Sequence, residues 1–97
     1  MASSVGQFCI AVSDLERSVR FYTEIMGLEE QGRTEIPNVN EVHLAGKSGG
    51  GRLQLAKFAE TIRPGAIDHG FALWKIYINV DDAQATWQKA VDAGKVV

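Results

Sequence analysis

Two polar side chains occupy equivalent positions in two similar stretches of the sequence. A shift of 68 residues places Asp14 on Asp82, and the same shift places Gln7 on Lys75. If the two stretches are repeated units packed about a pseudo-twofold axis, Gln7 and Lys75 approach each other in a shared cleft. An amide and an ammonium group would donate hydrogen bonds to a small molecule there. Chance similarity is the alternative, because the order strand, acidic cap and helix is common.

Aromatic residues cluster around the same stretches and could wall a site for a flat organic molecule. These residues are Phe58, Phe71, Trp74 and Tyr77. Ordinary packing in a core or an interface explains each of them at least as well.

Three further side chains could be reactive: His43, His69 and Cys9. His43 shares one face of a predicted strand with Glu41, where a metal or acid–base role competes with the simpler position at a rim or surface. His69 lies in a predicted loop, which favours a surface residue. A free cysteine usually behaves as a small buried apolar residue, so we expect Cys9 to be unreactive.

The composition restricts the class of protein. Ninety-seven residues make one domain, and a net charge of −2 argues against a nucleic-acid partner, since such domains usually carry a basic excess. No apolar run reaches the roughly 18 residues of a membrane span. One cysteine forms no internal disulfide, and the N-terminus lacks the basic and apolar regions of a signal peptide. We therefore expect a cytoplasmic domain.

Periodicity predicts one complete unit over residues 1–58. Ser13 and Glu16 match a capping box, apolar residues follow at helical spacing, and Gly27 ends the helix. Glycine-rich residues 46–51 form a hairpin loop. The predicted strands cover residues 7–12, 28–36, 41–45 and 52–58.

A second unit begins after a linker over residues 59–74, which has no clear period. Residues 75–80 predict a strand, Asp81 and Asp82 cap a helix, and Gly94 ends it. The order is a βαβββ module plus the βα start of a second, incomplete module over residues 75–97, in a single α+β domain. Such a length indicates a truncated chain or a fold that a partner completes.

The first unit resembles the vicinal oxygen chelate superfamily, which includes glyoxalase I, bleomycin-resistance proteins and extradiol dioxygenases. Residues 8–22 carry the pattern V-x-D-L-x-x-S-x-x-F-Y, and G-L follows at Gly27 and Leu28. Residues 75–94 resemble the start of a second module. The resemblance implies two βαβββ modules that form a U-shaped sheet around a cleft. It also implies a homodimer, and one form of such a dimer exchanges strands between the two copies.

Metal-dependent members of this superfamily take ligands from strands that face the cleft. Carried over by position, three of these ligands fall on Gln7, Gln54 and Lys75, and a fourth would lie after Val97. Glutamine offers a neutral carbonyl and protonated lysine offers no lone pair, whereas these metals favour carboxylate or imidazole ligands. We therefore expect a degenerate metal site and no cofactor.

The resulting hypothesis is a module that binds a small organic ligand, anionic or aromatic, in the cleft. Its ligand-binding residues would be Gln7, Gln54, Lys75 and Tyr77, with Phe58 and Trp74 as walls. The first alternative is a metal-dependent, glyoxalase-like lyase or isomerase. The second is a truncated or degenerate module without activity of its own.

Overall fold

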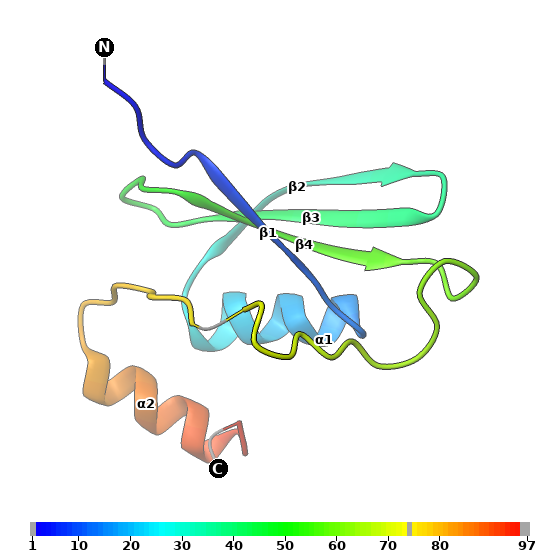
Figure 1. Ribbon diagram of the computed structural model, residues 1–97. Coiled ribbons are helices and arrows are strands. Elements are labelled where there is room, and N and C mark those ends of the chain that lie inside the picture. The colour runs from blue at the N-terminus through cyan, green and yellow to red at the C-terminus, as the bar shows by residue number, and fades with distance from the viewer. Residues whose placement is uncertain (1, 74, 96–97) are drawn as a thin grey trace.

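The computed structural model describes residues 2–73 and 75–95. The four strands, the first helix and a π-helical turn follow the predicted βαβββ order, and the second helix comes after them (Figure 1). The elements are β1 (Gln7–Ala11), α1 (Leu15–Arg20), η1 (Phe21–Ile25), β2 (Glu29–Ile36), β3 (Val39–Ala45), β4 (Arg52–Phe58) and α2 (Ala83–Asp92). Within the described residues, no helix is long and apolar enough to cross a membrane.

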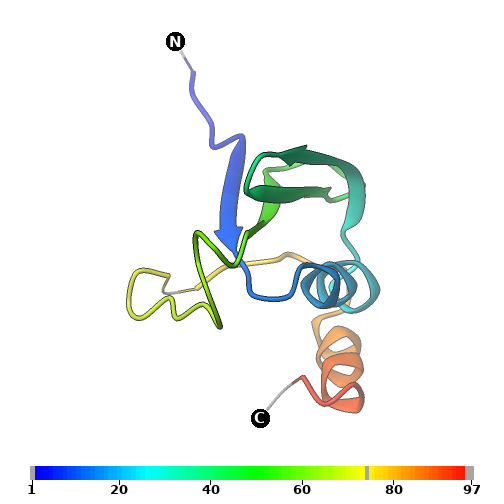
Figure 2. The ribbon, with the colours of Figure 1, turned by 90° about the vertical axis from the view of Figure 1, so that its right-hand side faces the viewer.

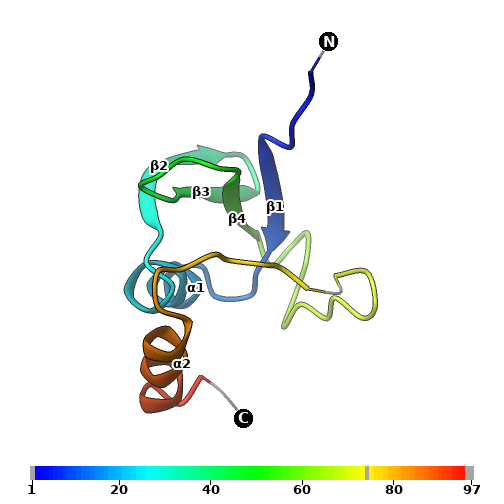
Figure 3. The ribbon, with the colours of Figure 1, turned by 90° about the vertical axis from the view of Figure 1, so that its left-hand side faces the viewer.

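The four strands form one mixed sheet in the order β1-β4-β3-β2. β1 pairs with β4 in parallel, and the other two pairs are antiparallel. The chain reaches β4 from β1 only after α1, β2 and β3, and this long connection allows the parallel pairing, because parallel neighbours cannot be joined by a tight turn. Both helices lie on the same side of the sheet (Figures 2 and 3).

The core lies between the sheet and α1. Val42, Leu44 and Leu55 are fully buried, and Val19 of α1 packs against the same cluster. Strand alternation explains this arrangement, since Leu53 and Leu55 point toward α1 while Gln54 and Ala56 point away from it. The face toward Gln54 is called the open face below.

The first helix begins one residue later than predicted. Asp14, not Ser13, is its N-cap, and the Asp14 carboxylate accepts a hydrogen bond from the backbone N–H of Arg17 at 3.1 Å. Ser13 instead accepts one from the N–H of Ile67 at 2.6 Å. The predicted capping box is therefore wrong, because a loop distant in sequence recruits the Ser13 hydroxyl.

Glu16, the other member of the predicted box, is held by Arg33 of β2. The guanidinium of Arg33 donates to both carboxylate oxygens of Glu16, at 2.8 and 2.9 Å, and also to Glu30 at 3.0 Å. Residues three apart on a regular strand face opposite sides, but the register of β2 shifts between Glu30 and Gly32. This bulge turns Glu30 and Arg33 to the same side, toward α1.

Residues 75–80 form no strand, unlike the prediction. The segment runs on the α1 side of the sheet before it enters α2 (Figures 1 and 3). A strand requires a hydrogen-bonded neighbour, and the four strands of the sheet pair with one another rather than with this segment. The helix predicted after it is confirmed, with Asp82 as N-cap and Gly94 at a φ of 71° just after its end.

Candidate functional site

Gln7 and Gln54 meet on the open face of the sheet. They lie on the neighbouring strands β1 and β4, where Gln54 is in register with Cys9. The Gln7 side chain donates from Nε2 to Oε1 of Gln54 at 2.7 Å. The structure therefore brings together two of the three side chains that the resemblance assigns to one site.

The same line of polar groups continues across β3 and β2. His43 is in register with Gln54, and its Nε2 lies 3.0 Å from the Thr34 hydroxyl oxygen. Gln7, Gln54, His43 and Thr34 thus form a polar row, to which each of the four strands contributes one side chain. The sequence pattern favoured a rim or surface position for His43 over a metal or acid–base role and gave no signal for Thr34, because only the strand register shows that they are neighbours.

Gln54 is the most informative member of the polar row. It is 8% exposed and lies on a central strand between the fully buried Leu55 and the buried Leu53. Buried polar side chains are uncommon in a sheet and need hydrogen-bond partners. Gln7 supplies that partner, and no buried side-chain nitrogen or oxygen among the described residues lacks one.

Cys9 borders the polar row and keeps its proton. Cys9 is exposed and not buried as expected, but partial desolvation against the sheet raises the pKa of its thiol, and the negative charge of Glu41 raises this pKa further. The thiolate is the reactive form of cysteine, and both effects disfavour it. Cys9 therefore presents a neutral thiol beside the two amides.

The other candidates lie away from the polar row. Lys75 and Tyr77 line a separate hollow on the α1 side, so the structure does not bring Lys75 to Gln7. Phe58 lies at the end of β4 with the guanidinium carbon of Arg63 5.4 Å from its ring centroid. Trp74 lies outside the described residues.

His69 of the loop after β4 has a structural role. Its Nε2 forms a hydrogen bond of 2.8 Å with the backbone carbonyl of Ala11 at the end of β1. This contact fixes the loop to the sheet, because a carbonyl oxygen can only accept the bond and the ring nitrogen must donate it.

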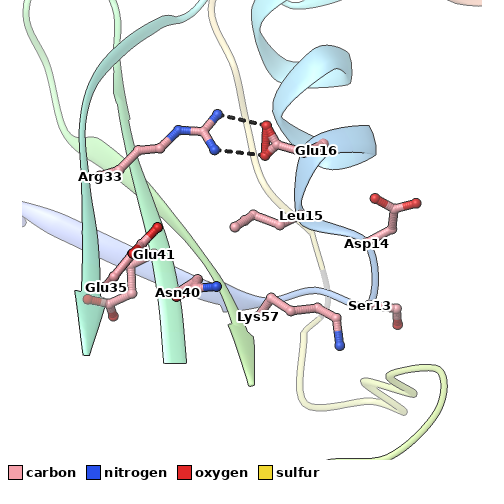
Figure 4. A pocket seen from close by; sticks show the side chains of 9 residues that line it. All are labelled: Ser13, Asp14, Leu15, Glu16, Arg33, Glu35, Asn40, Glu41 and Lys57. Carbon is pink, nitrogen blue, oxygen red and sulfur yellow. Dashed lines mark hydrogen bonds and ion pairs between the residues drawn. The ribbon is translucent and has the colours of Figure 1, made fainter. Parts of the chain in front are cut away.

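A hollow of about 410 Å³ lies between the start of α1 and the sheet (Figure 4). Its two cations are already engaged, Arg33 by Glu16 and Glu30 and Lys57 by Glu60 at 3.0 Å. The hydrogen bonds from Arg33 hold the pKa of both Glu16 and Glu30 below the usual range. We therefore interpret the ion pairs around this hollow as contacts that hold α1 against β2, and the hollow is not a candidate binding site.

Residues 4–97 match the Glyoxalase/Bleomycin resistance protein/Dioxygenase superfamily. The chain belongs to this superfamily. The match covers the four-stranded sheet and both helices, so the family assigned from the motif in residues 8–22 is confirmed. No curated protein matches the sequence.

Solved structures confirm the glyoxalase-like α+β fold. The trypanothione-dependent glyoxalase I of Leishmania major has a TM-score of 0.80 at 23% identity, over 96% of this chain and 68% of its own. A glyoxalase family protein from Bacillus cereus gives 0.75 at 19% identity, over 97% and 74%. TnmS3, an antibiotic binding protein from Streptomyces sp. CB03234, gives 0.70 at 25% identity, over 96% and 72%.

The residues at the positions that the resemblance assigns to metal ligands are poor donors for a divalent cation. Gln7 and Gln54 provide neutral amide oxygens, and the hydrogen bond between them occupies one of the two. Among residues 2–73 and 75–95, no three His, Cys, Asp or Glu side chains are grouped so that they could hold a metal. Lys75 lies elsewhere. This donor set does not fit a glyoxalase-type metal, which takes carboxylate or imidazole ligands.

Proposed function

We propose that this member of the superfamily binds a small organic molecule on the open face of its sheet, without the usual metal. The hydrogen bond between Gln7 and Gln54 is the observation that carries the proposal. It fixes the two amides at positions that the resemblance assigns to metal ligands, and the Gln7 oxygen and the Gln54 amino group have no side-chain hydrogen bond within the described residues.

The polar row favours a ligand that can both donate and accept hydrogen bonds. Each amide offers both kinds of group, and His43 and Thr34 continue the row across the sheet. Because Gln54 is held in a buried position, its amide is already oriented before a ligand arrives. Preorganised groups lose little entropy on binding, which raises affinity.

The likeness to TnmS3, an antibiotic binding protein, supports a binding role for this chain. We extend that property to this chain only as a class of ligand, namely an organic molecule with carbonyl, amide or hydroxyl groups on an aromatic body. The predicted homodimer and its strand exchange stay predictions, which sedimentation velocity would test.

A two-part experiment tests the proposal. First, the protein purified without chelator is analysed for bound metal, and we expect far less than one nickel or zinc per chain. Second, a panel of small aromatic amides and lactams is titrated into ¹⁵N-labelled protein. We expect members of the panel to shift the amide signals of Gln7, Cys9, His43 and Gln54, with or without EDTA.

Matched variants localise the binding. Gln54→Leu should abolish the shifts, whereas Gln88→Leu, an equal change on the exposed part of α2, should leave them unchanged. Stoichiometric metal, together with binding that EDTA removes, would overturn the proposal and favour the lyase or isomerase alternative. Binding that persists fully in Gln54→Leu would also overturn it.

A further inference from the structure

A hollow of about 780 Å³ lies on the side of the sheet opposite the polar row, between the glycine-rich hairpin and the segment that precedes α2. Phe8 and Leu53, which flank Gln7 and Gln54 in sequence, line it from the sheet. Strand alternation therefore separates this hairpin hollow from the polar row.

Apolar side chains remain exposed in the hairpin hollow. Val5 is 79% exposed and Phe8 47%, although both belong to the apolar residues that folding usually buries. The other apolar lining residues are Leu28, Leu53, Ile76 and Ile78. An apolar concavity of this size is typical of sites for small organic molecules, which measure about 300–1,000 Å³.

Lys75 brings a positive charge to the hairpin hollow, and none of the residues described as lining it is acidic. Arg52 also borders the hollow, but it is in register with Gln7 and lies two residues before Gln54, so strand alternation directs its side chain to the open face. Lys75 forms no ion pair within residues 2–73 and 75–95.

Lys75 and Tyr77 lie together on the segment that closes the hairpin hollow. The ammonium nitrogen is 5.6 Å from the centroid of the Tyr77 ring, and the ring is 79% exposed. An exposed aromatic face beside an unpaired cation offers stacking to a ring and a hydrogen bond to an anion. On the opposite wall, Gly49 and Gly50 have no side chains to prevent a close approach of the ligand to the backbone.

We propose that the hairpin hollow is a second binding site, which takes an aromatic molecule bearing a carboxylate. The ring would lie against Tyr77 and Phe8, and Lys75 would donate to the carboxylate. This site is independent of the polar row, because it shares none of the row's residues.

The test uses 2-naphthoate as the probe and the uncharged 2-naphthamide as its matched control. Each is titrated into ¹⁵N-labelled protein. We expect naphthoate to shift the amide signals of Gly49, Gly50 and residues 75–79, and to bind there about tenfold more tightly than the amide. That ratio is the usual effect of one charge-assisted hydrogen bond.

Variants assign the charge preference. Lys75→Gln should weaken naphthoate about tenfold while leaving naphthamide unchanged, so that this variant binds the two compounds equally. Arg17→Gln, an equal loss of charge on exposed α1, should have no effect. The proposal is overturned if naphthoate shifts no signal around the hollow, or if Lys75→Gln binds it as the parent does. Gln54→Leu should retain this binding, so failure here is distinct from failure of the polar row.

Discussion

Replacing Gln54 with leucine separates the binding role of the polar row from the stability of the sheet. If Gln54 is present for binding, its amide contributes little net stability. If it is present for structure, its loss should destabilise the fold strongly. The contacts of this side chain allow the two cases to be distinguished by magnitude.

The variant loses one hydrogen bond and gains buried apolar surface. A single hydrogen bond between uncharged groups contributes about 1 kcal/mol net. Gln54 is 8% exposed, so leucine at this position would be almost fully buried, and apolar burial stabilises by about 2 kcal/mol. The change of shape costs up to about 1.5 kcal/mol. Gln7 is exposed, so water replaces its lost partner.

We therefore expect the free energy of unfolding of Gln54→Leu to lie within about 1 kcal/mol of the parent. Urea unfolding followed by circular dichroism measures it. Leu55→Ala serves as a control on the same strand, because that fully buried residue should cost about 3 kcal/mol through the cavity it leaves. A loss above about 2 kcal/mol in Gln54→Leu, with the slope in urea unchanged, would refute this reasoning.

Three further outcomes can be measured. Asp82→Ala removes the carboxylate that accepts from the Ala85 N–H at 2.9 Å, and should cost about 1 kcal/mol in urea unfolding; an unchanged midpoint would contradict this role. Arg33 lowers the pKa of Glu16 in the folded chain, so their pair stabilises above the unfolded pKa and is lost as the pH falls through the folded pKa. Glu16→Gln should therefore flatten the acid side of the curve of Tm against pH, and an unaltered curve would exclude the effect. Iodoacetamide should alkylate Cys9 more slowly than an unstructured cysteine peptide at neutral pH, because its thiol pKa is raised; equal rates would show otherwise.

Local signals in the sequence were sufficient for most of the fold. Alternating apolar residues placed β4, and Gly27, with a φ of 82°, ended the first helical stretch as predicted. Ser13 was assigned the wrong partner because its hydroxyl bonds to Ile67, 54 residues away. Local patterns cannot reveal such a contact, since either Ser13 or Asp14 can cap the same helix.

The candidate site was predictable only in part for the same reason. The motif and its resemblance placed Gln7 and Gln54 at one site, and the structure joins them. The proximity of His43 and Thr34 follows only from the register of β3 against both β2 and β4. That register includes a bulge in β2, which no pattern of residues predicted. Lys75 was assigned to the same cleft because residues 75–80 read as a strand, yet that segment pairs with none of the four strands.

The displacement of Lys75 changes what each face of the sheet can bind. With Lys75 beside Gln7, one cleft would have combined amides and a cation, and its ligand would have been anionic. The structure instead places Gln7 and Gln54 on the open face, where Arg52 is in register with Gln7, and Lys75 on the other face, with the sheet between them. Gln7 and Phe8 are consecutive on β1, so their side chains point to opposite faces of the sheet. The same strand therefore contributes Gln7 to the polar row and Phe8 to the hairpin hollow. The two faces should therefore bind different ligands: molecules with several hydrogen-bonding groups at the polar row, and aromatic carboxylates at the hairpin hollow.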